Sequence, residues 1–312
     1  MLCTTPPPSQ PCFRHVLTLR APAKINLYLK ILGRRSDGYH ELDTLMQKVE
    51  LHDELELSLA DEPGIRLICQ DADLPENEGN IVFRAARLFL NQTGKNGQGL
   101  HIILRKRIPL AAGLGGGSSD AAAVLTGLNQ LTGAGRTTEE LAAMGLRLGA
   151  DVPFFVYDYP AAWSGGIGEQ LEPAAPLRRF IVLLVNPGIA VSTKWAYETF
   201  SQTAGRIALT AAGKKFNLLN FSSESGLPLR RQQAFLPSDL LNDLEPVTAE
   251  KHSVIGELKA RLLAAGAAGA MMSGSGSTVF GLFAAGTEAQ AESCLRELRQ
   301  EYGQAYLAAP LT

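Results

Sequence analysis

Apolar and polar residues alternate over a stretch near the start of the chain. Across residues 25–31 every second residue is aliphatic, which is the period of a strand that buries one face. We therefore expect a strand over 16–31, with Lys24 and Asn26 together on the face opposite the core. An Asp-Gly pair at 37–38 marks the turn that follows it.

A second pattern has the period of helices. Apolar residues recur every three or four positions after residues that commonly cap helix N-termini. Asn80 is expected to cap one helix, and Thr138 another. Between them, Ser118 or Ser119 is expected to cap a helix that ends at Gly133.

The second half of the chain combines both patterns. The uninterrupted apolar run Phe180–Asn186 predicts a central strand covered on both faces, whereas 201–236 has no clear periodicity. Strands and helices alternate irregularly, which favours an α+β fold over a doubly wound parallel sheet. The remaining expected elements are helices at 193–200, 238–245, 254–265 and 287–302, and a strand, a Gly-Ser turn and a strand at 269–283.

Length and composition describe an ordinary globular chain. It has 312 residues, is 46% hydrophobic and 19% charged, and carries a formal net charge of -2. This length predicts two domains, which we place at 15–172 and 173–312, after a Pro-rich tail over 1–14. Without a basic excess, nucleic-acid binding is not expected. No apolar run is long enough to cross a bilayer, so no membrane association is expected either.

The cysteines give no sign of a metal site or of a disulfide framework. Cys3, Cys12, Cys69 and Cys294 form no CxxC pair and no metal knuckle. The Pro-rich start lacks the apolar segment of a secretory signal. We therefore expect a cytoplasmic protein with free thiols and no protein-held metal cluster.

A glycine-rich turn is the strongest candidate for chemistry. Gly113, Gly115, Gly116 and Gly117 run directly into a helix, whose free N–H groups and dipole suit a phosphate. No Lys follows them, so the turn is not a P-loop, and a serine replaces the third glycine of a dinucleotide fingerprint. A triphosphate is the expected ligand, with Ser119 able to reach a phosphate oxygen or a metal. A tight turn without a ligand is the alternative.

Five segments together resemble one known family. The segment Pro109 to Ser119 resembles the phosphate-binding motif of the GHMP small-molecule kinases, the family of galactokinase, homoserine kinase and mevalonate kinase. Segments 21–27, 35–41, 148–154 and 273–280 resemble a branch of that family that acts in non-mevalonate isoprenoid precursor synthesis. The matches occur in the right order and cover most of the chain.

The resemblance implies a fold, a reaction and its cofactors. It implies a two-domain GHMP-kinase-like fold with the active site in the interdomain cleft, in a monomer or homodimer. ATP and Mg²⁺ would serve as cofactors, and the substrate would be a small alcohol with a cytidine diphosphate moiety, phosphorylated on its 2-hydroxyl. The implied ATP-binding residues are Asn80, Pro109, Leu110, Ala111, Ala112, Gly113, Leu114, Gly115, Gly116, Gly117, Ser118 and Ser119.

The resemblance also implies a catalytic pair, Lys24 and Asp151. In phosphoryl transfer an Asp orients the attacking hydroxyl and accepts its proton. An ammonium beside that carboxylate keeps it ionised and balances charge on the transferred group. A solvated lysine and an Asp that only caps its own loop are the alternatives. The Gly-Ser loop at 274–276 would close the cleft wall near the glycine turn.

The implied substrate contacts surround a nucleobase. Tyr39 would stack on the cytosine and His40 would hydrogen-bond to it, with Tyr197 as the opposing ring. Stacking on an aromatic ring contributes ~1–3 kcal/mol per base. Asn26 and Thr193 complete the implied substrate-binding set.

Two other functions stay open from the sequence. One is a GHMP kinase with another acceptor, such as homoserine or mevalonate, although these acceptors offer no base for Tyr39 and His40 to hold. The other is a nucleotide-binding module without turnover, in which Lys24 and Asp151 are structural.

Overall fold

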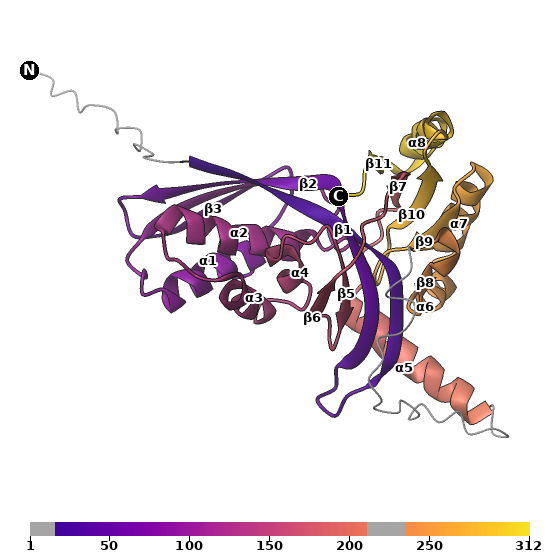
Figure 1. Cartoon of the computed structure of the whole chain (residues 1–312), viewed down its shortest axis with the longest axis horizontal. Coiled ribbons are helices and arrows are strands. Elements are labelled where there is room, and N and C mark those ends of the chain that lie inside the picture. The colour runs from indigo at the N-terminus through magenta and orange to yellow at the C-terminus, as the bar shows by residue number, and fades with distance from the viewer. Residues whose placement is uncertain (1–15, 211–234) are drawn as a thin grey trace, which may run out of the picture.

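The computed structural model describes residues 16–210 and 235–312, and this described part contains two β-sheets with helices packed against them (Figure 1). The expected tail over 1–14 lies outside the described residues, as does most of the segment 201–236. The mixture of helices with parallel and antiparallel strand pairs confirms the α+β class.

The first sheet is built on one long hairpin. Its strands are β1 (Val16–Arg34), β2 (His40–Ala60), β3 (Gly64–Gln70), β4 (Gly99–Arg105), β5 (Ala161–Gly165), β6 (Gln170–Pro173) and β8 (Leu241–Asn242). They run in the order β3-β4-β2-β1-β8, and β5 pairs with β2 and β6. Strands β1 and β2 are antiparallel from the pair Val16–Ser58 to the pair Arg34–His40, so the hairpin spans the length of the sheet.

The hairpin differs from the sequence expectation in two respects. The sequence leaves 39–50 open between a return strand and an irregular segment, and the structure places 40–50 together with the alternating residues after them in the single strand β2. The middle of β1 is buried on both faces, so Lys24 and Asn26 share a face as predicted, but this face is covered by protein. The sequence pattern therefore gives the strand correctly and the environment of its polar residues incorrectly.

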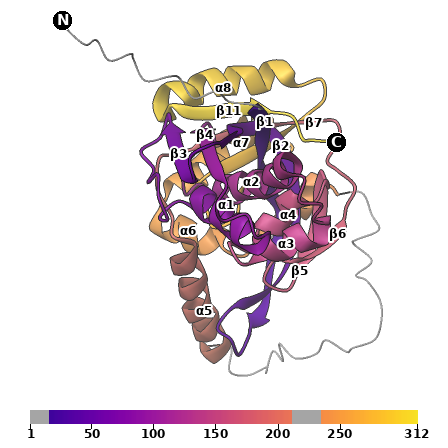
Figure 2. The ribbon, with the colours of Figure 1, turned by 90° about the vertical axis from the view of Figure 1, so that its left-hand side faces the viewer.

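Helices α1 (Ile81–Gln92), α2 (Gly116–Thr132), α3 (Thr138–Leu146) and α4 (Val152–Val156) pack on one face of this sheet (Figures 1 and 2). The core between them includes Leu55, Val82, Phe89, Leu100 and Val124, all fully buried. Burial of such a side chain contributes about 1.5–3 kcal/mol. This core fixes α2, and with it the glycine turn that precedes α2.

The helix α2 begins earlier than predicted. Its first residue is Gly116 and its N-cap is Gly115, which has the left-handed conformation (φ 70°), so the prediction of a Ser118 or Ser119 cap is wrong. A glycine takes this conformation at little cost, so the chain turns straight into the helix without a side-chain cap. The helix ends at Gly133 as predicted.

The caps of the neighbouring helices follow their local sequence signals closely. Val82 N donates to Asn80 Oδ1 at 2.9 Å, so the predicted Asn80 cap of α1 is confirmed. The cap of α3 is Thr137, one residue before the predicted Thr138, because Glu140 completes a capping box with Thr137.

The second sheet carries the C-terminal half of the core. Its strands are β7 (Phe180–Asn186), β9 (Gly269–Met272), β10 (Val279–Ala284) and β11 (Gln304–Ala308), in the order β11-β7-β10-β9. The predicted central strand β7 is confirmed as an interior strand. Helices α7 (Val254–Ala264) and α8 (Glu288–Tyr302) pack against this sheet (Figure 1).

Two C-terminal predictions need correction. The helix α5 (Thr193–Thr210) begins where predicted but extends past 200. The predicted helix at 238–245 is wrong, because this stretch contains a short 3₁₀ helix (Pro237–Asp239), then β8, and only the start of α6 (Glu245–Lys251). The Asn242 side chain donates to two carbonyls of the Gly-Ser loop region, which holds β8 extended against β1.

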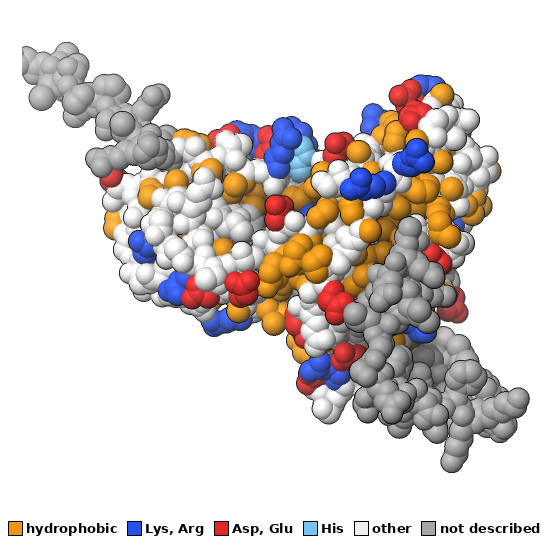
Figure 3. Space-filling view, in the orientation of Figure 1, with side chains coloured by type: hydrophobic (Ala, Val, Ile, Leu, Met, Phe, Trp, Pro, Cys, Tyr) orange, Lys and Arg blue, Asp and Glu red, His pale blue; other side chains and the backbone are white. Residues whose placement is uncertain are grey.

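The surface offers no region of one dominant charge on the face in Figure 3, where positive and negative side chains are interspersed and hydrophobic ones gather in the middle. None of the helices in the described residues has the length and apolarity that crossing a membrane would need. The domain boundary after residue 172 stays a prediction, since β8 from the second predicted domain pairs with the first sheet.

Candidate active site

A cavity of about 1250 Å³ opens where the glycine turn, β1, the start of α4 and the start of α5 meet. It brings together residues from both halves of the chain. The predicted site residues that line it are Lys24, Asn26, Tyr39, His40, Asn80, Pro109, Leu110, Ala111, Ala112, Gly113, Leu114, Gly115, Gly116, Gly117, Ser118, Asp151, Thr193 and Tyr197.

Ser119 is the predicted residue that the structure turns away from the cavity. It is 1% exposed, and its Oγ has no hydrogen-bond partner within the described residues. Because α2 starts at Gly116, Ser118 lies on the cavity side of the first turn, and the next residue is rotated by about 100° toward the core.

The glycine turn presents unpaired backbone N–H groups to the cavity. In α2 the first N–H with a helical acceptor is that of Ser119, which donates to Gly115 O at 2.9 Å. The N–H groups of Gly116, Gly117 and Ser118 precede it and line the cavity. Together with the positive end of the helix dipole they form a site for a phosphate group.

The Gly-Ser loop of the C-terminal half packs directly on this turn. Gly113 has a φ of 76°, and a Cβ there would lie 2.1 Å from Ser273 O, so only glycine fits. Ser273 Oγ donates to Gly113 O at 2.9 Å and accepts from Asn26 N at 3.3 Å. Gly274 and Ser275 line the cavity, so the loop is part of its wall.

Lys24 and Asp151 form an ion pair at the cavity wall, with 3.4 Å between Lys24 Nζ and Asp151 Oδ2. The Lys24 side chain is 5% exposed and that of Asp151 36%, so the carboxylate is the member that a ligand can reach. Lys24 Nζ also donates to Asn26 Oδ1 at 2.5 Å, and Asn26 Nδ2 donates to Thr44 Oγ1 at 2.9 Å. The ammonium is thus held between a carboxylate and a fixed amide.

The rings expected to bind a base are arranged around His40. Tyr197 stacks on His40 with 5.1 Å between ring centroids and 28° between planes, whereas Tyr39 is 60% exposed at the cavity mouth. Burial lowers the pKa of His40, and Arg34 lowers it further, so the ring is neutral at neutral pH. A base held between Tyr39 and Tyr197 stays a prediction.

The hydrogen bonds around His40 assign its tautomer. Ser201 Oγ donates its one proton to Tyr197 O at 3.0 Å, so His40 Nε2 donates to Ser201 Oγ at 2.6 Å. The Nδ1 atom of His40 is then an acceptor, which suits an amino group such as that of cytosine.

Tyr197 and Thr193 lie on the first turns of α5 and reach the cavity from the other side. Burial raises the pKa of the Tyr197 hydroxyl, and the nearby Asp151 carboxylate raises it further. Thr193 Oγ1 lies 3.0 Å from Ser275 Oγ, which ties α5 to the Gly-Ser loop. Tyr197 thus connects the second half of the chain to the Lys24–Asp151 pair, and Thr193 connects α5 to the cavity wall.

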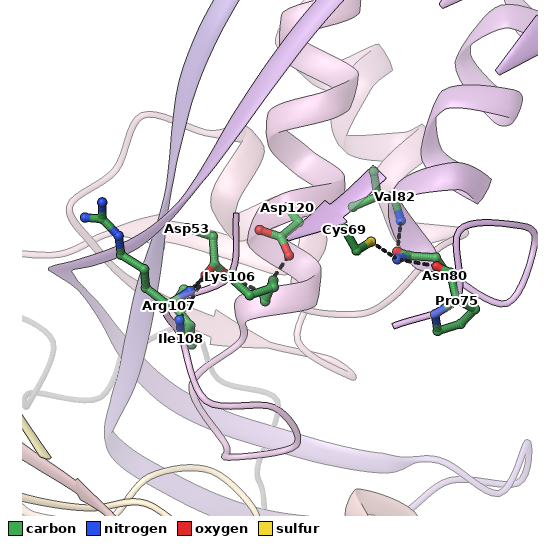
Figure 4. A network of polar contacts seen from close by, with 9 residues as sticks. All are labelled: Asp53, Cys69, Pro75, Asn80, Val82, Lys106, Arg107, Ile108 and Asp120. Carbon is green, nitrogen blue, oxygen red and sulfur yellow. Dashed lines mark hydrogen bonds and ion pairs between the residues drawn. The ribbon is translucent and has the colours of Figure 1, made fainter. Parts of the chain in front are cut away.

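Both polar atoms of the Asn80 side chain form hydrogen bonds within the fold. Its Oδ1 accepts from Val82 N, and its Nδ2 donates to Pro75 O at 2.9 Å and to Cys69 Sγ at 3.4 Å (Figure 4). The side chain is buried at the edge of the cavity, so its predicted contact with adenine or ribose stays a prediction.

A buried charge cluster beside the glycine turn was not predicted. Lys106 Nζ contacts Asp53 Oδ2 and, at 2.8 Å, Asp120 Oδ2 (Figure 4). Asp53 Oδ1 also accepts from Arg107 N at 2.6 Å and Ile108 N at 2.9 Å. Strand β2, the segment after β4 and helix α2 are thereby tied together just before and after the turn.

The two carboxylates of this cluster are not equivalent. Burial raises the pKa of Asp120 to about 7, with Lys106 lowering it and Asp53 raising it. Asp120 Oδ1 has no hydrogen-bond partner within the described residues, whereas both oxygens of Asp53 accept hydrogen bonds. Asp120 is therefore the carboxyl of the pair that takes up a proton.

The described residues contain no group of three or more metal-binding side chains. The carboxylates that line the cavity are those of Asp37, Asp120, Asp151 and Glu198, and they are not gathered into one cluster. This arrangement fits Mg²⁺ that arrives on a nucleotide, because Mg²⁺ commonly takes only one or two protein carboxylates and completes its shell with phosphates and water.

Two family models match the chain. The model described as the N-terminal domain of GHMP kinases matches residues 80–159, and the model of the GHMP kinase C-terminal domain matches residues 226–304. With the fold and the glycine turn, these matches define the protein as a small-molecule kinase of the GHMP class, which uses ATP.

Comparisons with whole proteins show to which branch of the GHMP kinases the chain belongs. A 4-diphosphocytidyl-2-C-methyl-D-erythritol kinase of Geobacter sp. (strain M21) is 48% identical over 267 residues, covering 86% of this chain and 89% of the relative. One of Citrifermentans bemidjiense is 46% identical, covering 93% and 95%. A crystal structure of 4-(cytidine 5'-diphospho)-2C-methyl-D-erythritol kinase matches with a TM-score of 0.72 and 33% identity, over 95% of this chain and 100% of that one. The chain belongs to the 4-diphosphocytidyl-2-C-methyl-D-erythritol kinases.

Proposed function

We propose that this protein transfers the γ-phosphoryl group of ATP to the 2-hydroxyl of 4-diphosphocytidyl-2-C-methyl-D-erythritol, in non-mevalonate isoprenoid precursor synthesis. The names of its relatives support the substrate. The observation that carries the chemistry is the Lys24–Asp151 ion pair, which lies in the wall of the same cavity as the glycine turn.

Asp151 has the role of general base in this proposal. Its carboxylate is the exposed member of the pair, so it can accept a hydrogen bond from the acceptor hydroxyl and then its proton. Lys24, buried behind it, pairs with the carboxylate and adds positive charge near the transferred phosphoryl group. The transition state of phosphoryl transfer is loose, so positioning and charge are the main contributions of the protein.

The two ends of the cavity would hold the two substrates. The unpaired N–H groups at the start of α2 would bind the ATP phosphates. Mg²⁺ bound to those phosphates would neutralise part of their charge, and Asp120 and Asp151 are two of the carboxylates that line the cavity. Tyr39, His40 and Tyr197 would hold the cytosine.

The test is a coupled ADP-release assay with three acceptors. We expect ADP release with 4-diphosphocytidyl-2-C-methyl-D-erythritol, and none above background with homoserine or mevalonate. The alternatives matter because a homoserine kinase of Cytophaga hutchinsonii shares the fold, with a TM-score of 0.66 at 21% identity. Turnover of homoserine or mevalonate in place of the cytidylyl substrate would overturn the substrate assignment. Nucleotide binding without turnover of any acceptor would identify a binding module.

We also propose that residues 15–172 form one domain and 173–312 the other. The cavity lining supports this division, because Lys24, Gly113 and Asp151 come from the first part and Thr193, Tyr197 and Gly274 from the second.

A further inference from the structure

The carboxylate of Asp151 depends on a very short helix for its position. Asp151 is the N-cap residue of α4, which contains five residues and ends at the C-cap Tyr157. A helix of this length satisfies few of its own backbone groups and is not stable in isolation. Contacts with the rest of the protein must therefore hold α4, and with it Asp151, in place.

Two lysines on neighbouring strands contact the two ends of α4. Lys24 on β1 and Lys48 on β2 are directly paired in the antiparallel ladder, and residues paired in this way project on the same face of a sheet. Lys24 Nζ lies 3.4 Å from Asp151 Oδ2 at the start of the helix. Lys48 Nζ donates to Tyr157 O at 2.7 Å at its end.

The surroundings of Lys48 favour a charged ammonium at this place. The Lys48 residue is 6% exposed, and its Nζ lies 5.1 Å from the ring centroid of Phe154 and 5.9 Å from that of Phe155. A cation is stabilised over aromatic rings and at the C-terminal end of a helix. Both rings belong to α4, so the ammonium lies against Phe154 and Phe155 as well as the C-cap carbonyl of Tyr157.

The same contacts reach the glycine turn. A Cβ at Gly115 would lie 3.0 Å from both the Phe155 ring and Lys24 Cγ, so Phe155 packs closely against the N-cap residue of α2. A shift of α4 would therefore move Asp151 relative to the phosphate-binding N–H groups.

We propose that Lys48 is a positioning residue for the phosphoryl transfer, which fixes the C-terminal end of α4 and thereby holds Asp151 at the distance and angle that the reaction needs. The proposal rests on the proposed function, because it assigns Lys48 a role through Asp151. Lys48 is not among the residues that line the cavity, so its role is indirect.

The titration of Lys48 gives this role a signature in pH. Burial lowers the pKa of Lys48 to about 8, partly offset by the carboxylate of Asp158, which follows α4. The residue opposite on β1 is Lys24, a second positive charge. Above pH 8 Lys48 loses its charge and the contact with the rings and the helix end weakens, so turnover is expected to fall on the alkaline side.

The first test replaces the ammonium and keeps the stem, in Lys48→Met. We expect kcat to fall by about 10-fold or more while the KM values of ATP and of the cytidylyl substrate stay within about 2-fold, because a misplaced catalytic group affects the transition state most. The alkaline fall of kcat around pH 8 should be absent in this variant. Leu262→Ala in the second core is the control, since it destabilises the fold far from α4 and should leave kcat of the folded enzyme unchanged.

A second variant covers the case in which Lys48→Met does not fold. Lys48→Gln retains an N–H donor for Tyr157 O without a charge, and should give an intermediate kcat that does not change between pH 7 and pH 9. A wild-type kcat in both variants, while Asp151→Asn is inactive, would overturn the role of Lys48 alone. Wild-type turnover in Asp151→Asn would instead overturn the proposed catalytic pair. A loss of kcat in Leu262→Ala equal to that in Lys48→Met would show that stability, and not positioning, causes the effect.

Discussion

The amide of Asn26 is oriented by the hydroxyl of Thr44, to which its Nδ2 donates at 2.9 Å. Thr44 Oγ1 donates its single proton to Tyr28 O at 2.6 Å, so toward Asn26 it can only accept. Asn26 Oδ1 is therefore turned toward Lys24 Nζ, 2.5 Å away. A threonine that no sequence motif singled out thus determines which atom of Asn26 faces the ammonium.

Replacing Thr44 with Val should reduce turnover. The change keeps the shape of the side chain, but leaves the Asn26 amide N–H without its acceptor and free to rotate its oxygen away from Lys24. We expect kcat to fall by about 10-fold with little change in the KM of ATP. Steady-state kinetics with both substrates varied will measure this.

Thr44→Ser is the matched rescue, since it restores the hydroxyl and should recover most of kcat. Thr132→Val at the end of α2 removes a hydroxyl that bonds only to a helix carbonyl, and should leave both constants unchanged. Equal kinetics in Thr44→Val and the wild type would mean that Lys24 does not need the Asn26 contact.

Asp151→Asn should separate binding from chemistry. The amide keeps the size of the side chain but cannot accept the proton of the acceptor hydroxyl, so we expect turnover to fall by about 100-fold or more. The phosphate-binding N–H groups are untouched, so nucleotide affinity, measured by calorimetry, should stay within a few-fold. Near-normal turnover would contradict the assignment of Asp151 as the base.

Local signals in the sequence were enough for much of the fold. The apolar run of β7 and the cap at Asn80 each depend on residues close in sequence, and both predictions are confirmed. The α2 cap was wrong because a left-handed Gly115 starts the helix where a serine cap was expected. The β8 strand was missed because Asn242 is held by carbonyls about 30 residues away.

The site residues that belong to a sequence motif could be predicted, whereas the residues held by buried contacts with distant parts of the chain could not. Lys24 and Asp151 belong to recognisable segments, and the structure brings them together. Lys48 and Lys106 look like ordinary solvent-facing lysines on strands, yet both are buried. The partner of Lys48 is a backbone carbonyl 109 residues away, and Asp53 lies 53 residues from Lys106, so no local pattern reveals either contact.

Replacing Tyr39 with Ala should weaken the binding of the cytidylyl substrate. Tyr39 is the exposed ring at the mouth of the cavity, and loss of its stacking on cytosine should raise the KM of that substrate by about 10-fold, with a smaller effect on ATP. Tyr39→Phe keeps the flat ring and should behave like the wild type. An unchanged KM in Tyr39→Ala would remove the ring from the base-binding set.

Asp120 should make the protein less stable as the pH rises toward 8. Burial raises the pKa of Asp120 to about 7 in the folded state, above its value in the unfolded chain, so the folded protein binds the extra proton. The stability gained in this way is fully present below the unfolded pKa and is lost as the pH rises through 7. The neutral amide of Asp120→Asn cannot ionise. The free energy of unfolding of this variant minus that of the wild type, both measured by urea titration, should therefore increase by about 2 kcal/mol from pH 5.5 to pH 8. The control is Asp61→Asn, at an exposed carboxylate, whose free energy of unfolding should differ from that of the wild type by the same amount at every pH in this range. A constant difference between Asp120→Asn and the wild type across this range would mean that Asp120 stays ionised beside Lys106, and that the Lys106 ammonium outweighs burial.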